Sequence, residues 1–386
     1  MANALMLGGG APTLTLQSGA LVALLEKEVK FDAISTAGGG MLVGLLYAAP
    51  KGTSPRQALE NTRDMGVHDS IYDLFPVNFK VFHKAGSLAD TYRRALQALP
   101  RLGPGQDAAS RLFADSMALM FAAWCPSDLS EKSLGLCDHA PWIDEVVDFD
   151  KLKSFPGEFY MNAYCIEDQE MAIFTKEQIT PDHFRAALAF PFIYPPFKLN
   201  GKTYIEGSAI DTLCFEGLLK YREERLRREQ AGETRTQKLA ALEPLRNVVV
   251  FDVLSSRKLI REPRSLYDAW VQSIMIPLVE IAKDDIRLFE QVHNQHWSDA
   301  QPKLNLLRIT FEIPDEHWPH VLDWSYSNLS KLYDIGYAAG LKFYDENEEA
   351  LRAAALMSAL RPQVRAADQL VETARSRPRS RAAPRS

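Results

Sequence analysis

Hydrophobic and polar positions near the start of the chain follow a repeated pattern of strand, turn and helix. Two short apolar runs, residues 4–7 and 31–34, are each followed by a glycine-rich turn and then by an apolar helical pattern. The pattern predicts buried parallel strands and helices over residues 14–25 and 41–49. The second helix is apolar on all sides, so we expect it to be buried in the middle of the molecule.

Turn and cap signals locate further elements. The pair Asn200-Gly201 predicts a β-hairpin over residues 198–205, and Ser54-Pro55 with Gln57 predicts a capped helix start. The other strands are expected at residues 158–166, 170–174, 247–254 and 303–313, and the other helices at 88–99, 108–124, 180–189, 213–230, 265–296 and 328–360.

The pattern also indicates how the chain is divided. We expect an α/β domain over residues 1–313, a C-terminal helical extension over 314–372 and a disordered Arg-rich tail over 373–386. Residues 72–154 are rich in aromatic residues and helical patterns, which predicts an insertion. The insertion forms either a lid over the site or a structural cap without ligand contact. The tail either attracts anionic lipid headgroups or stays solvated without a partner.

Composition narrows the class of protein. An apolar content of 46%, a charged content of 24% and a net charge of −6 are typical of a soluble globular protein and argue against nucleic acid as the main partner. No apolar run reaches the length of a membrane span, and no signal-peptide pattern precedes the first strand, so we expect a cytoplasmic location. We expect no cofactor. We also expect no metal, because the pairs His293/His296 and His317/His320 lack further ligands.

The two glycine-rich turns are the first candidates for chemistry. They are Gly8-Gly9-Gly10-Ala11 and Gly38-Gly39-Gly40. Each directly precedes a predicted helix, whose N-terminus exposes unpaired amides and can bind an anion or a developing oxyanion. Because both turns follow neighbouring parallel strands, we expect a site at the carboxyl edge of the sheet.

Three segments of the sequence resemble the patatin-like phospholipase family. Residues 8–10 are similar to its oxyanion loop, residues 31–44 to its strand, nucleophile elbow and helix, and residues 183–207 to the segment that ends in its Asp-Gly-Gly/Ala motif. The resemblance implies a three-layer α/β/α fold with a mostly parallel central sheet and added helices. It also implies a lipid acyl hydrolase, in which an elbow serine attacks the ester, an aspartate acts as base and the glycine loop holds the oxyanion.

The chain departs from this family at the positions that would carry the reaction. In an alignment without gaps, Gly38 occupies the nucleophile position, followed by the elbow residues Gly39 and Gly40. Glu206 occupies the base position, and Ser208 follows in place of glycine or alanine.

These departures leave three interpretations open. The first is an acyl hydrolase with a displaced nucleophile, for which Ser35 and Thr36 are candidates. In the second, Glu206 acts as acid or base on a water or on a substrate group; the alternative for Glu206 is a turn residue bonded to backbone. The third is a lipid-binding or partner-binding protein without catalysis. The expected ligand is a lipid or acyl ester, with peripheral contact to a membrane or lipid inclusion.

Overall fold

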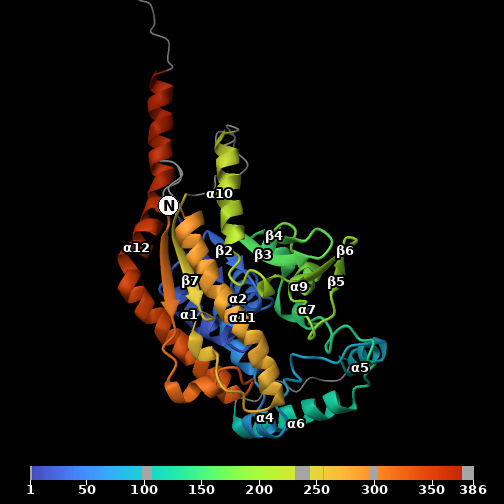
Figure 1. Cartoon of the computed structure of the whole chain (residues 1–386). Helices are drawn as coiled ribbons and strands as arrows, with labels where there is room; N and C mark the ends of the chain where they lie inside the picture. The colour runs from blue at the N-terminus through green and yellow to red at the C-terminus, as the bar shows by residue number, and fades with distance from the viewer. Residues whose placement is uncertain (1, 98–106, 231–243, 255, 295–302, 376–386) are drawn as a thin grey trace, which may run out of the picture.

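The fold is built around one mixed sheet with parallel strands at its centre (Figure 1). The computed structural model describes residues 2–97, 107–230, 244–254, 256–294 and 303–375. The strands are β1 (Ala2–Leu7), β2 (Ala33–Thr36), β3 (Glu158–Cys165), β4 (Glu170–Thr175), β5 (Phe197–Leu199), β6 (Lys202–Glu206), β7 (Leu245–Asp252) and β8 (Asn305–Thr310). The path of strand pairings is β5-β6-β3-β2-β1-β7-β8. On β3, the strands β2 and β6 share one edge and β4 pairs with the other. The pairs β3-β2, β2-β1, β1-β7 and β7-β8 are parallel. The pairs β3-β4, β3-β6 and β5-β6 are antiparallel.

Helices cover both faces of this sheet. The α-helices are α1 (Leu14–Glu26), α2 (Gly39–Ala48), α3 (Pro55–Glu60), α4 (Asp69–Leu74), α5 (Ser87–Gln97), α6 (Ala108–Trp124), α7 (Ile143–Val146), α8 (Phe149–Lys153), α9 (Pro181–Ala187), α10 (Phe215–Gln230), α11 (Leu266–Leu288) and α12 (Tyr326–Arg375). Short 3₁₀ segments are η1 (Asn61–Met65), η2 (Gly207–Ala209), η4 (Arg257–Leu259) and η6 (Asp315–His320), and a π-helical turn, η5 (Phe289–His293), follows α11.

Strand β1 shows how the layers are separated. Successive side chains of a strand point to opposite faces of the sheet. Leu5 and Leu7 belong to a core cluster with α1, α2 and α12, whereas Ala4 and Met6 belong to a second cluster with α10 and the end of α11. The predicted α/β/α arrangement with a mostly parallel central sheet is therefore confirmed.

Most predicted elements are present with small shifts at their ends. The second strand was expected at 31–34 but spans Ala33–Thr36, because pairing with β1 continues up to the glycine turn. The hydroxyl of Ser54 accepts a hydrogen bond from the backbone amide of Gln57, with 3.2 Å between oxygen and nitrogen. This bond confirms the predicted cap. The hairpin turn residues Asn200 and Gly201 both have positive φ, as a type I′ turn requires.

The predicted helices of the insertion agree with the structure better than the predicted C-terminal helix does. Predicted helices at 88–99 and 108–124 correspond to α5 and α6, and the break between them lies outside the described residues. Helix α12 begins at Tyr326 and continues to Arg375, well past the predicted end at residue 360 and into the predicted tail. Residues 376–386 of that tail lie outside the described residues.

Helices α1 and α12 pack with their backbones in close contact. A Cβ on Gly19 would lie 2.0 Å from the carbonyl oxygen of Tyr333, and a Cβ on Gly336 would lie 2.0 Å from that of Leu16. Residues 14–24 of α1 are all buried, since α12 covers one side of the helix and Leu21 shares a core cluster with Leu5 and Leu7 of β1. The glycines on both helices therefore set the distance between them, and with it the position of the loop that leads into α1.

We predict that Gly336→Ala separates these helices. The gain in helix propensity is about 1 kcal/mol, but the added methyl meets a backbone oxygen that cannot move alone. The free energy of unfolding should fall by roughly 2 kcal/mol, as for other overpacked sites. Urea denaturation would measure it, with Ala338→Ser at an exposed position of α12 as control. An unchanged midpoint for Gly336→Ala would contradict this packing.

Candidate active site

One edge of β3 brings together two segments that are far apart in sequence. Strand β2 pairs with the first half of β3, where Thr36 lies beside Met161, and β6 pairs with the second half, where Glu206 lies beside Ala163. Both use the same edge, because β4 occupies the other one along residues 160–165. The turn after β2 therefore meets the end of β6.

Gly38 lies at the tip of the turn after β2, in a backbone conformation that favours glycine. Its φ is +53° and its ψ is −135°. The next amide, of Gly39, donates to the carbonyl of Gly9 at 2.9 Å, so this turn is joined to the first glycine-rich loop. A Cβ on Gly40 would lie 2.4 Å from the carbonyl oxygen of Leu7. The sharp entrance into α2 therefore depends on small residues.

A side chain at position 38 would point at Glu206 and Ser208. Its Cβ would lie 3.1 Å from Oε1 of Glu206 and 2.9 Å from Oγ of Ser208. Both of these side chains are buried, and the hydroxyl of Ser208 donates a hydrogen bond to Oε1 of Glu206. The site thus combines a carboxylate, a hydroxyl and a backbone position that has no side chain.

Burial controls the ionisation of Glu206. Removal of the carboxylate from water raises the pKa of Glu206 to about 8, and the hydrogen bond from Ser208 opposes this shift. The backbone amide of Glu206 donates to the carbonyl of Ala189 at 3.0 Å. Within the described residues, the carboxylate accepts its hydrogen bond from a hydroxyl rather than from a backbone group.

The first glycine-rich loop lies against the same turn. Gly9 has a φ of +106°, and the side-chain amide of Gln17 donates to the carbonyl of Gly8. Within the described residues, the amides of Gly9, Gly10 and Ala11 donate no hydrogen bond. These three amides are therefore available to an anionic group.

The comparison with protein families identifies the domain that contains this site. The family model described as patatin-like phospholipase matches residues 5–219, which is more than half of the chain. The chain belongs to the patatin-like phospholipase family. No curated protein sequence matches it. Among solved structures it is similar to VipD from Legionella pneumophila, with 12% identity and a TM-score of 0.37; the match covers 89% of this chain and 66%, slightly less than two thirds, of the VipD chain.

The geometry can now be compared with the roles that the sequence predicts. The sequence predicts Gly38 at the family's nucleophile position and Glu206 at its base position. In the structure a side chain at residue 38 would contact Glu206. The amide of Gly39 is bonded to the carbonyl of Gly9. The roles of these residues stay predictions.

Ser35 and Thr36, the two nucleophile candidates taken from the sequence, lie before this turn and within β2. The hydroxyl of Ser35 donates to the carbonyl of Cys214 at 2.6 Å, and that of Thr36 to the carbonyl of Tyr160 at 2.9 Å. Both residues are buried, and neither lines the cavity described below. Their hydroxyls are thus committed to backbone groups outside the site.

An apolar cavity of about 190 Å³ opens from the glycine loops and Glu206. Its walls come from many parts of the chain, which include α2, η1, the insertion, the segment around α9, helix α11 and the segment between η6 and α12. Among the lining residues are Val81, Phe82, Trp142, Phe184, Leu188, Phe190, Ile193, Trp270, Ile274 and Leu278. Residues of the insertion therefore form part of the wall, while its role as a lid or as a structural cap stays a prediction.

Two features of the site were not found from the sequence. The lining residues of α11 recur as Trp270, Ile274 and Leu278, a helical stripe whose spacing could have indicated a buried face but not its partner. The hydrogen bond between Ser208 and Glu206 was also missed, although the two residues are close in sequence.

Other groups lie away from this cavity. His317 bonds to Asn328 and His320 to Asp323, while His296 lies outside the described residues. In the described part of the chain, no group of three His, Cys, Asp or Glu residues is placed to hold a metal ion. Across the same residues, no helix is both long enough and apolar enough to span a membrane.

We predict that Glu206 makes stability depend on pH. Because the pKa of Glu206 is about 8 when folded and near its ordinary 4.5 when unfolded, the folded protein holds an extra proton between these values. Raising the pH from 5.5 to 8 should lower the free energy of unfolding, and Glu206→Gln should remove roughly 2 kcal/mol of that loss.

Urea denaturation at several pH values tests this expectation. Asp211 has a pKa raised to about 7 and acts in the same direction. The free energy of unfolding should therefore still fall with pH in both the wild type and Glu206→Gln, but less steeply in the variant. Parallel stability curves for the wild type and Glu206→Gln would contradict it.

Proposed function

We propose that this protein hydrolyses acyl-ester lipids, with one acyl chain in the cavity and the ester beside Glu206. The observation that supports this most is the position of Glu206 in the cavity wall. It is the carboxyl-bearing side chain among the described lining residues, and it lies next to the two glycine-rich loops. A carboxyl group in the wall of an apolar cavity matches a ligand with a long apolar chain and a polar ester.

The apolar walls also support selection by chain length. Each buried methylene stabilises binding by about 0.8 kcal/mol, roughly fourfold in affinity. Turnover should therefore improve with each added carbon until the cavity is filled.

A lipid surface is the proposed source of the substrate. Leu74 at the end of α4 and Leu266 at the start of α11 are 87% and 89% exposed. Residues of these two regions line one groove, which shares Val271 and Leu322 with the cavity wall.

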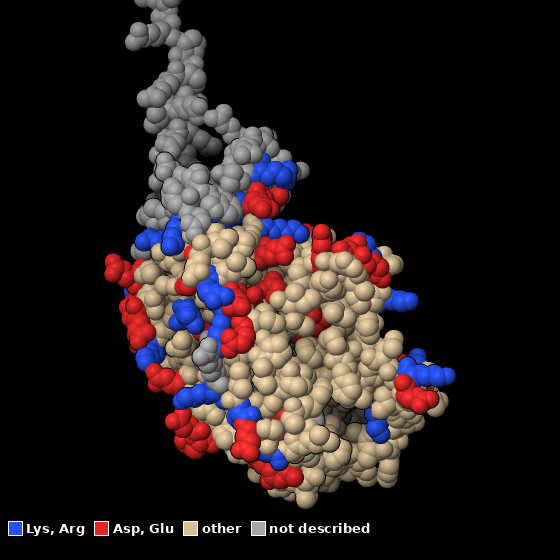
Figure 2. All heavy atoms as spheres, viewed as in Figure 1, with Lys and Arg blue, Asp and Glu red and all other residues tan. Residues whose placement is uncertain are grey.

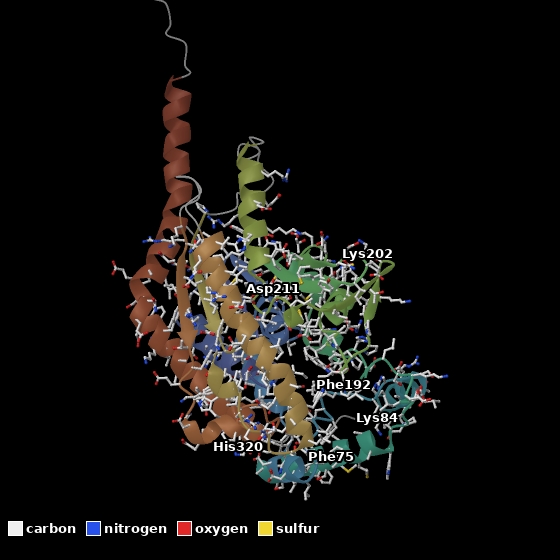
Figure 3. All side chains as sticks on the ribbon, viewed as in Figure 1. Phe75, Lys84, Phe192, Lys202, Asp211 and His320 are labelled. Carbon is white, nitrogen blue, oxygen red and sulfur yellow. The ribbon has the colours of Figure 1, made fainter. Side chains whose placement is uncertain are left out.

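The surrounding surface is consistent with peripheral contact to lipid. Figure 2 shows a broad area with few charges toward the end of the molecule where α4 and α6 lie. Exposed Phe75 and Phe192 lie toward this end in Figure 3, and the ring of Phe192 contacts that of Trp270, with 5.2 Å between centroids.

Lipid binding without catalysis is the second candidate. It is favoured by the missing side chain at Gly38 and by the use of the Gly39 amide within the protein. In that case the cavity would bind a fatty acid or lipid, and Glu206 would donate its proton to the headgroup.

Turnover of p-nitrophenyl esters from acetate to laurate, and of phospholipid vesicles, separates the two candidates. We expect turnover by the wild type that increases with chain length. Glu206→Gln should lose about a hundredfold or more in kcat/KM, the usual contribution of a general base. Glu177→Gln, on the exposed surface, is the matched control. Thermal stabilisation by fatty acids without any turnover would instead indicate a binding protein.

The pH profile is a further test of Glu206 as base. Only the ionised carboxylate accepts a proton, so kcat/KM should rise with pH and level off above about 8. The other ionisable group near the carboxylate is the buried phenol of Tyr194, whose pKa burial raises well above this range. A profile that is flat between pH 6 and 9 would exclude this role.

A further inference from the structure

We infer that Ser208 is the nucleophile of this site and replaces the serine missing at position 38. The inference rests on the proposed ester hydrolysis and adds the residue that would carry the acyl group. Ser208 and Glu206 would then form the serine and carboxylate pair. The serine would come from the segment after β6 rather than from the turn after β2.

The location of the hydroxyl is the main reason. Oγ of Ser208 lies 2.9 Å from the position that a Cβ at residue 38 would occupy. It therefore lies in the region that a serine side chain on the elbow would enter. A serine at position 38 and one at 208 would compete for this space, and the chain has glycine at one and serine at the other.

The hydrogen bonding of Ser208 is that of an activated nucleophile. Its hydroxyl donates to Oε1 of Glu206, and both residues line the cavity. The hydroxyl of Thr212, which also lines the cavity, donates instead to Oδ2 of Asp285 at 2.7 Å. Of these two hydroxyls, the one on Ser208 is paired with the base.

The backbone around Ser208 is held in place. Ser208 lies in η2, where the amides of Ile210 and Asp211 both donate to the carbonyl of Gly207 at 2.9 Å. The side chain of Asn162 on β3 donates to the carbonyl of Asp211 at 2.9 Å. A Cβ on Gly207 would lie 2.8 Å from Asn162, so the glycine permits this close packing. The hydroxyl is thus positioned by the sheet, as a catalytic group requires.

The reaction is an acyl transfer in two steps. Oγ of Ser208 bonds to the ester carbonyl carbon while its proton passes to the carboxylate of Glu206. The carbonyl oxygen becomes an oxyanion, for which we assign the amides of Gly10 and Ala11 as donors. The bond to the alcohol then breaks, and the alcohol oxygen takes the proton from Glu206.

Water completes the cycle on the resulting acyl ester of Ser208. Glu206 accepts a proton from water, and the hydroxide adds to the acyl carbonyl carbon. The bond to Oγ breaks, Ser208 recovers its proton from Glu206, and the fatty acid is released.

The test combines turnover with covalent labelling. A long-chain alkyl fluorophosphonate should form a bond from phosphorus to Oγ with loss of HF, and peptide mass spectrometry should locate it on Ser208. Ser208→Ala should abolish the label and lower ester turnover by at least about a thousandfold. Ser154→Ala, an exposed serine after α8, is the control expected to keep both.

A relocation variant separates a chemical role from a structural one. Gly38→Ser alone should crowd Ser208, whereas Gly38→Ser with Ser208→Gly should move the label to residue 38. A purely structural role of the Ser208 hydroxyl would not transfer labelling to a new position.

The outcomes distinguish the inference from the proposed function. Wild-type turnover that survives Ser208→Ala, or a label on another residue, would overturn the inference and leave ester hydrolysis standing. A label on Ser208 without turnover of any ester would support the inference and reject the proposed substrates. Neither label nor turnover would reject both.

Discussion

The site depends on the way two strands share one edge of β3. Strand β2 pairs along the first half of that edge and β6 along the second, because β4 occupies the opposite edge. Backbone hydrogen bonding therefore fixes the distance between Gly38 and Glu206, which are 168 residues apart in sequence. The close packing of α1 against α12 holds the first glycine loop against the same point.

This constraint holds the turn after β2 and the end of β6 together whichever residues stand there. The backbone at Gly38 has a positive φ that favours glycine, and the carboxyl group of Glu206 faces it. A hydroxyl at this contact can be supplied from either segment, since both strands end there. The apolar cavity walls remove Glu206 from water and raise its pKa, so the same burial that would bind an acyl chain also sets the pH at which the carboxylate can act as a base.

Local signals predicted much of the fold. Asn200-Gly201 fixed a hairpin and Ser54 a helix start, because these residues act on their own backbone. The glycine-rich turns and the resemblance around them led to Glu206 and to the unusual Gly38. The sequence could not show where individual side chains point. Ser35 shares a segment with the elbow, yet its hydroxyl points to Cys214, while Ser208 reaches the elbow from the segment after β6. The wall formed by α11 also depends on packing between distant segments.

The most direct test is to locate a bound acyl chain in a crystal. A crystal of the protein soaked with a fatty acid that carries a terminal bromine would show the bromine by anomalous scattering. We predict the bromine peak among the apolar walls of the cavity, with the carboxyl group of the fatty acid beside Glu206 and Ser208. A bromine peak confined to the outer groove between α4 and α11, with no ligand beside Glu206, would contradict it.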